Sequence, residues 1–160
     1  MPIQVGDKIP DVSIKTMADG GMQDVSTAEL CAGKKVVLFA VPGAFTPTCS
    51  MQHLPGFIEQ ADAIKAKGVD TIACMAVNDA FVMDAWGQDK GAGDKVLMLA
   101  DGNAEFAKAL DLTMDGTGIG FGTRAQRFAL VIEDGVVTHA AVEEPMKFDV
   151  SAAEKVLAAL

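Results

Sequence analysis

The chain has 160 residues, half of them hydrophobic, a formal net charge of −9 and three cysteines, which suits a single domain over residues 1–160 whose core needs no disulfides. The negative charge argues against general binding of nucleic acid or anionic membranes, and no apolar run reaches the roughly 18 residues that span a bilayer. The cysteines lack a disulfide-framework spacing and the first residues lack the character of a secretory signal, which favours reduced thiols in the cytoplasm.

The first quarter of the chain predicts a strand, a short helix and a buried strand. Apolar and polar residues alternate around residues 12–14, before a turn over residues 19–21, and this alternation indicates a strand. Residues 26–29 spell Ser-Thr-Ala-Glu, a capping-box pattern for a short helix that ends near Gly33. The nearly continuous apolar run over residues 36–41 predicts a buried strand.

The next segment places a cysteine at the start of a helix. Residues 50–67 predict a long helix closed by Gly68, and Pro55 is expected to kink that helix or break its first turns. Cys49 then lies in the first turn, at the carboxyl edge of a sheet. Unpaired backbone N–H groups and the positive end of the helix dipole favour a thiolate there. The sequence therefore centres on one activated cysteine.

The middle of the chain alternates strands and helices. Buried strands are predicted over residues 71–77 and 96–100. Asn78 or Asp79 is expected to cap a helix after the first of them, and a short helix over residues 104–110 follows the second.

The last third of the chain predicts a loop, a hairpin and a helix. Residues 111–122 are rich in glycine and are expected to be irregular. Residues 128–132 and 136–142, joined by the Asp-Gly pair at 134–135, predict a hairpin, and residues 151–154 cap a terminal helix. Alternating strands and helices followed by a hairpin and a helix predict an α/β, thioredoxin-like fold with a central mixed sheet flanked by helices.

Pro42, Thr46 and Cys49 form the pattern Pro-x-x-x-Thr-x-x-Cys. This pattern resembles the active-site signature of peroxiredoxins, and the wider string over residues 41–57 is similar to the peroxiredoxin-5-like (type II) subfamily. The resemblance covers most of the chain and continues through residues 73–86, 124–128 and 133–135. It implies a thiol-dependent peroxidase whose substrates are hydrogen peroxide and small organic (alkyl) hydroperoxides, and it implies a homodimer.

Peroxide reduction needs a thiolate that attacks one oxygen and donors that stabilise the charge moving onto the other. Thr46 is close enough to Cys49 in sequence for its hydroxyl to reach the sulfur, and Pro42 fixes the loop and, by resemblance, shields the thiolate from water. Arg127 precedes an apolar strand and should project at a sheet end. By resemblance it aligns with the arginine that contacts sulfur and peroxide. Arg124 is expected to support the site or to form a surface ion pair.

Other residues near the signature have simpler roles. Gly43, Phe45 and Thr48 belong to the same loop and are candidates for the lining of the substrate pocket. His53 is interpreted as a packed histidine and not as a general base, because a thiolate needs no base once it has formed. With two distant histidines, the second being His139, and dispersed cysteines, the chain lacks the ligands for a zinc site. No metal or bound organic cofactor is expected.

The sequence leaves the recycling of the oxidised cysteine open. Many members of the subfamily carry a resolving cysteine near the carboxyl terminus, but no cysteine follows Val142. A disulfide between Cys49 and Cys74 requires Cα atoms within about 7 Å. We favour an inert core thiol at Cys74 and a bystander at Cys31.

The simplest route of recycling is therefore a one-cysteine cycle. Glutathione attacks the sulfenic acid, and glutaredoxin or a second glutathione releases the mixed disulfide. Thioredoxin, acting with Cys74, is the alternative reductant. A holdase or binding module is an alternative from another class, and Cys49→Ser separates it from the enzyme because only the peroxidase needs the thiol.

Overall fold

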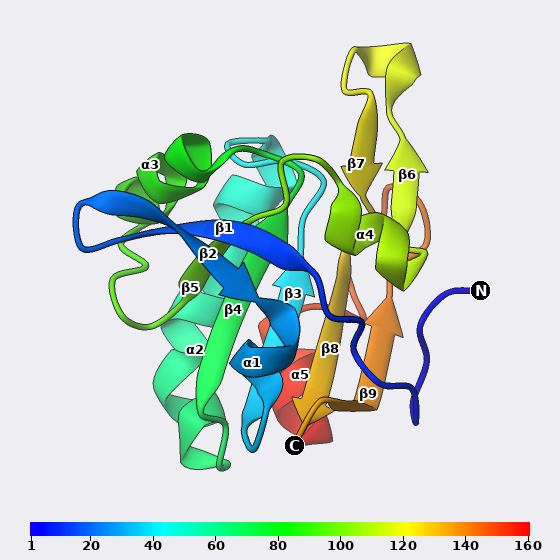
Figure 1. The fold of residues 1–160 in the computed structure, drawn as a ribbon. Helices are drawn as coiled ribbons and strands as arrows, with labels where there is room; N and C mark the ends of the chain where they lie inside the picture. Colours follow the sequence, from blue (N-terminus) through cyan, green and yellow to red (C-terminus); the bar gives the residue numbers. More distant parts are fainter.

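The computed structural model describes residues 1–160, and its centre is a seven-stranded sheet in the order β2-β1-β5-β4-β3-β8-β9 (Figure 1). The strands of this sheet are β1 Ser13–Ala18, β2 Gly21–Ser26, β3 Lys35–Ala40, β4 Thr71–Ala76, β5 Leu97–Ala100, β8 Phe128–Glu133 and β9 Val136–Val142. β3, β4 and β5 run parallel, whereas β1, β2, β8 and β9 pair antiparallel with their neighbours. The predicted α/β, thioredoxin-like fold with a central mixed sheet is confirmed.

Five α-helices flank the sheet on its two faces. They are α1 Thr27–Cys31, α2 Leu54–Ala66, α3 Ala80–Lys90, α4 Glu105–Leu110 and α5 Ala153–Ala159. Because side chains alternate between the faces of a strand, β3 gives Val37 and Phe39 to one core and Val36 and Leu38 to the other. α2, α3 and α5 pack on the first face, and α1 and α4 on the second. None of these helices combines the length and the apolar character that crossing a membrane requires.

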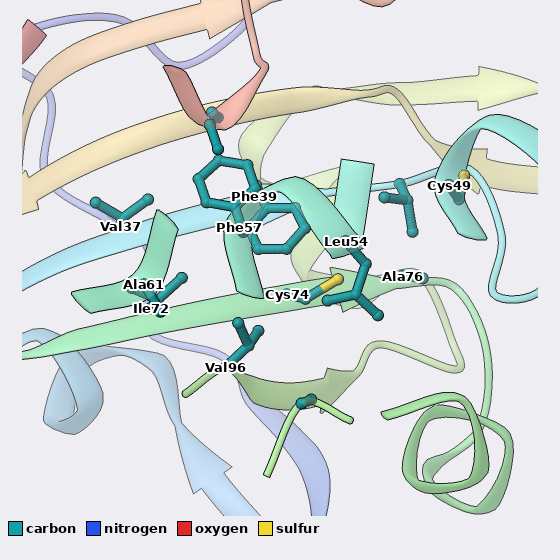
Figure 2. Close-up of a cluster of buried hydrophobic side chains, with 14 of the residues drawn as sticks. Val37, Phe39, Cys49, Leu54, Phe57, Ala61, Ile72, Cys74, Ala76 and Val96 are labelled. Carbon is teal, nitrogen blue, oxygen red and sulfur yellow. The ribbon is translucent and has the colours of Figure 1, made fainter. Parts of the chain in front are cut away.

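The core on the first face includes the segment that carries Cys49. Phe39 of β3 stacks on Phe57 of α2, with ring centroids 4.0 Å apart (Figure 2). Cys49 and Cys74 belong to the same buried cluster but lie at separate places within it (Figure 2). The apolar face of α2 therefore fixes one side of the site, because it anchors the helix that follows Cys49 to the sheet.

Two strand-forming segments differ from the sequence expectation. The glycine-rich stretch over residues 111–122 was expected to be irregular, but β6 Thr113–Asp115 pairs antiparallel with β7 Thr123–Ala125 around a short 3₁₀ turn. Strands of three residues offer too few alternations to be recognised. β2 was also not predicted, because it is a largely exposed edge strand with little apolar character.

Of the predicted helix caps, two are confirmed and one is wrong. Ser26 caps α1 by accepting from the backbone N–H of Glu29, and Asp79 caps α3 in the same way, as predicted. The predicted cap at Ser151 is wrong: α5 begins at Ala153, after Ala152, which makes no side-chain cap bond. The Ser151 hydroxyl instead donates to a buried carboxylate from the end of β9.

Candidate active site

Cys49 begins a π-helical turn, Cys49–His53, that leads directly into α2. Pro55 has no N–H to donate to the carbonyl four residues earlier, so a regular α-helical pattern cannot extend back through it. Leu54 instead donates its N–H to the Cys49 carbonyl, five residues back. The expected disturbance at Pro55 is confirmed, and it sets Cys49 in a widened turn in which its side chain is fully buried.

Arg127 reaches the sulfur from the opposite side of the site. It lies between β7 and β8, and its Nη2 is 3.1 Å from the Cys49 Sγ. Its Nη1 lies 2.9 Å from His53 Nδ1, and its guanidinium carbon lies 5.7 Å from the centre of the Phe148 ring. Arg127 forms no ion pair with any carboxylate. The structure thus places one unneutralised cation against the thiol.

His53 holds the other end of this guanidinium. It is fully buried, and its Nε2 lies 3.0 Å from the Ser151 carbonyl oxygen. Because a carbonyl only accepts, this contact assigns the proton to Nε2 and leaves Nδ1 to accept from Arg127. Burial, and secondly the Arg127 charge, lower the pKa of His53 to about 3. A packed histidine was expected, but its contact with Arg127 was not foreseen.

The Thr46 hydroxyl donates no hydrogen bond to the sulfur in this structure. Its hydroxyl donates to the Gly43 carbonyl over 2.7 Å, and its own carbonyl accepts from the Ser50 N–H over 2.8 Å. The expected bond from the Thr46 hydroxyl to Cys49 is therefore wrong for this state. Because the Thr46 hydroxyl donates its proton to the Gly43 carbonyl within the loop, its oxygen keeps lone pairs that can accept a hydrogen bond from another group.

Arg124 lies against the signature loop and not against the thiol. Its Nη1 donates to the Pro42 carbonyl over 3.1 Å and its Nε to the Phe121 carbonyl over 3.0 Å. Its guanidinium also lies 4.7 Å from the centre of the Phe121 ring. A Cβ at Gly43 would stand 2.7 Å from Nη1 of Arg124, so only glycine leaves room for this contact. Arg124 forms no surface ion pair and braces the loop.

The outer residues of the loop are more open. Phe45 has a left-handed backbone with φ of 64° and is half exposed, and its ring lies 6.4 Å from that of Trp86. Thr48 is half-buried and makes no cap bond with its side chain. The N–H of Ala44, directly before Phe45, donates to the side chain of Asn78, which ties this part of the loop to the segment that follows β4.

The other two cysteines are both free and buried. Burial raises the pKa of Cys74 well above its ordinary value, and the nearby Cys49 adds to that rise. Burial also raises the pKa of Cys31 to about 11. Neither thiol therefore supplies a thiolate near neutral pH. No group of His, Cys, Asp and Glu side chains comes together in a way that could hold a metal ion.

The chain is similar to proteins of one family along almost its whole length. The model of the family described as Redoxin matches residues 4–157. Peroxiredoxin-2E-2, chloroplastic, of Oryza sativa subsp. japonica is 55% identical over 163 residues, covering 99% of this chain and 72% of that protein. Peroxiredoxin-2B of Arabidopsis thaliana is 50% identical over 160 residues, covering 99% of each. The structure of reduced Prx3 in complex with H2O2 from Vibrio vulnificus superposes with a TM-score of 0.95 at 56% identity, covering 98% of each chain.

Proposed function

Because the chain belongs to the Redoxin family, as a type II peroxiredoxin with peroxidase activity, we propose that Cys49 is its peroxidatic nucleophile and Arg127 the cation that serves it. The observation that carries this proposal is the 3.1 Å approach of Arg127 Nη2 to the Cys49 sulfur. A guanidinium without a carboxylate partner is free to interact with the negative charge that the reaction moves from sulfur to oxygen. The substrates proposed are hydrogen peroxide and small organic hydroperoxides.

The reaction is a displacement at oxygen. The Cys49 thiolate donates an electron pair to one peroxide oxygen, the O–O bond breaks, and the other oxygen leaves with the bonding pair. That oxygen takes up a proton and departs as water or alcohol, while Cys49 is oxidised by two electrons to the sulfenic acid. The Arg127 hydrogens already point at the site where charge develops, so they stabilise the oxygens as the sulfur loses its charge.

The loop orients the peroxide. Since the Thr46 hydroxyl gives its proton to the Gly43 carbonyl, its oxygen is free to accept from the O–H of the peroxide. Arg127 then donates to the peroxide and Thr46 accepts from it, which aligns the O–O bond with the sulfur. Pro42, whose carbonyl Arg124 holds, shapes the wall of the pocket and exposes no N–H there. Phe45 and Thr48 complete this wall, with Gly43 beside them.

The sulfenic acid is proposed to be reduced by an external thiol. Glutathione attacks the Cys49 sulfur and releases water, and a second thiol, from glutaredoxin or glutathione, displaces the reduced Cys49 from the mixed disulfide. Support comes from Cys74 and Cys31, which are both buried with a raised pKa and are poor internal nucleophiles. Because Cys49 is itself fully buried, the turn that carries it must open for this step.

A turnover assay tests the proposal. Peroxide consumption is measured for the wild type, Cys49→Ser and Cys74→Ala, each with glutathione and glutaredoxin or with thioredoxin and its reductase. We expect Cys49→Ser to be inactive with both systems and Cys74→Ala to keep its turnover with glutathione. Turnover in Cys49→Ser would reject the proposed nucleophile. A loss in Cys74→Ala confined to the thioredoxin assay would assign Cys74 as the resolving thiol.

The assembly and compartment are also proposed. Phe45 and Phe81 are 50% and 62% exposed, and two such rings are suited to burial between the two copies of a homodimer. Sedimentation of the wild type against Phe81→Glu tests this, with a shift to monomer expected for the variant.

Three free thiols favour a reducing compartment such as the cytoplasm. A thiol-trapping assay on the protein in intact cells would show a disulfide if that were wrong.

A further inference from the structure

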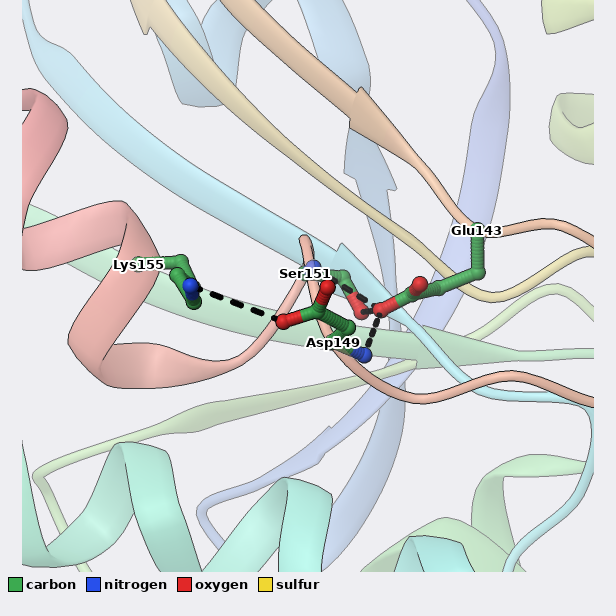
Figure 3. Close-up of polar contacts among 4 residues, drawn as sticks. All are labelled: Glu143, Asp149, Ser151 and Lys155. Carbon is green, nitrogen blue, oxygen red and sulfur yellow. Dashed lines mark hydrogen bonds and ion pairs between the residues drawn. The ribbon is translucent and has the colours of Figure 1, made fainter.

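Glu143 is a buried carboxylate that the proposed reaction does not use. It follows directly after β9 and is 7% exposed. Its Oε2 accepts three hydrogen bonds: from the Asp149 N–H over 2.6 Å, the Ser151 N–H over 2.9 Å and the Ser151 hydroxyl over 2.7 Å (Figure 3). Glu143 forms no ion pair, and the Lys155 ammonium in the same view pairs with Asp149 over 3.6 Å. The Glu143 carboxylate thus accepts hydrogen bonds from backbone N–H groups and a hydroxyl group only.

These three bonds fix the turn between β9 and α5, and that turn contacts the active site twice. The Ser151 carbonyl lies 3.0 Å from His53 Nε2, which sets the tautomer that accepts from Arg127. The Phe148 ring meets the His53 ring edge-on at 5.0 Å and lies beneath the Arg127 guanidinium at 5.7 Å. Glu143 also donates its own N–H to the Arg127 carbonyl over 3.0 Å.

Ionisation of Glu143 strengthens this arrangement. Burial by itself raises the pKa of Glu143, but the hydrogen bonds from Ser151 and Asp149 outweigh it and hold that pKa below its usual range. Three donors that converge on one oxygen bind a carboxylate more strongly than a neutral acceptor. The other charged groups of this region are Arg127 and the ion pair of Lys155 with Asp149, and His53, which contacts Arg127, is neutral.

We propose that Glu143 is a positioning residue for peroxide reduction, which holds the turn at Asp149 and Ser151 so that His53 aims Arg127 at the Cys49 sulfur. This inference rests on the proposed function, because it assigns a cause to the orientation of Arg127. Glu143 touches neither the sulfur nor the peroxide and acts through Ser151 and His53.

Two reaction rates of Cys49 distinguish a loss of positioning from a general loss of structure. Stopped-flow kinetics gives the rate of Cys49 with hydrogen peroxide, and alkylation by iodoacetamide gives its reactivity toward a reagent that has no O–O bond for the guanidinium to orient; both are measured at a pH high enough to ionise the thiol in every variant. For Glu143→Ala we expect a fall of about 10–100-fold with peroxide, the effect of a displaced catalytic group, and a change below about threefold with iodoacetamide. Equal losses in both rates, or wild-type rates in both, would overturn the inference.

Glu144→Ala is the matched control. Glu144 is the next residue, its side chain is 75% exposed, and its only ion pair is with Lys147 at 2.9 Å. Both rates should equal those of the wild type. If Glu143→Ala does not fold, Glu143→Gln takes its place: it keeps the size and one neutral acceptor, and we expect a smaller fall with peroxide of about three- to tenfold.

A double-mutant cycle distinguishes this inference from the proposed function. If Glu143 acts through Arg127, Glu143→Ala should cause no further loss in an Arg127→Ala background. An undiminished loss in that background would overturn the positioning role while leaving the proposed function intact. An Arg127→Ala variant that reacts as fast as the wild type would reject the proposed role of Arg127, and with it the inference.

Discussion

Arg127 is held from two sides, and each contact has a different consequence. One nitrogen of its guanidinium faces the Cys49 sulfur and the other faces His53 Nδ1. Because burial keeps His53 neutral, the histidine accepts from the guanidinium and adds no charge of its own beside the Cys49 sulfur. A carboxylate in the place of His53 would pair with Arg127 and weaken its charge at the sulfur.

Arg127→Lys tests the need for a forked donor. Lysine keeps the charge but not the two parallel N–H groups, so it cannot contact sulfur and His53 together. We expect the rate of Cys49 with hydrogen peroxide to fall by about 10²–10³-fold, the effect of losing one aimed donor. Stopped-flow kinetics measures this rate, with thermal unfolding as the control for folding. A loss below about threefold would mean that charge alone suffices.

Gly43→Ala tests the brace on the signature loop. The new Cβ would stand 2.7 Å from Arg124 Nη1, at the flexible end of a side chain that can move away. We therefore expect Gly43→Ala to lower the peroxide rate as much as Arg124→Ala does, with little change in unfolding temperature. The double variant should be no slower than either single one, and additive losses would show that the two residues act separately.

The signature residues could be predicted because they are neighbours in sequence. Pro42, Thr46 and Cys49 span eight consecutive positions, so their pattern by itself indicates the proposed chemistry. His53 contacts Arg127 across 74 positions, and such a pairing depends on how β8 lies beside β3. The hydroxyl of Thr46 could not be placed either, because the choice between the sulfur and the Gly43 carbonyl depends on loop geometry.

At the scale of elements, the π-helical turn Cys49–His53 is the part that the proposed recycling step would open. Its second residue, Ser50, accepts a hydrogen bond over 2.8 Å from Nε1 of Trp86, the only tryptophan in the chain. α3 therefore carries a reporter that contacts the turn directly. An opening that moves Ser50 would break this bond to the fully buried indole.

Trp86 fluorescence should follow the formation of the mixed disulfide at Cys49. After peroxide and then glutathione are added, we expect the emission to shift to longer wavelength, because the turn opens and water reaches the indole. Cys49→Ser should show no shift. Complete glutathionylation by intact mass without any spectral change would show that the thiol is reached while the turn stays closed.

The strong apolar runs made most of the sheet predictable. β3 and β4 are buried strands, as their apolar runs predict, and the Asp-Gly pair at 134–135 located the hairpin of β8 and β9. β6 and β7 have three residues each, and their pairing with one another, more than their composition, makes them strands. The local sequence around Ser151 predicts a helix cap. It cannot show that the fold brings the Ser151 hydroxyl to the Glu143 carboxylate instead.

At the scale of the whole molecule, the buried polar groups around His53 link stability to pH. His53 lies between Phe39, Phe57 and Phe148 in the core on the first face of the sheet. Protonation would put a second positive charge beside Arg127 in that core, which burial makes costly. The folded protein therefore binds fewer protons at this site than the unfolded chain does.

The free energy of unfolding should fall as the pH falls. The pKa of His53 is about 3 in the fold and 6.5 in the unfolded chain, so its contribution is lost progressively below pH 6.5. Linkage gives a loss of about 2 kcal/mol between pH 7 and pH 5. Urea unfolding at both pH values measures it. His53→Gln cannot titrate and should show a loss smaller by about this amount; an unchanged loss would contradict a neutral His53.

The identity of the oxidised residue can be measured directly. Reduced protein is treated with one molar equivalent of hydrogen peroxide in the presence of dimedone, which traps sulfenic acids, and the site is located by peptide mass spectrometry. We predict a single adduct, on Cys49, formed much more slowly in Arg127→Lys. Adducts on Cys74 or Cys31 with Cys49 unmodified, while peroxide is consumed, would contradict a peroxidase built on Cys49 and Arg127.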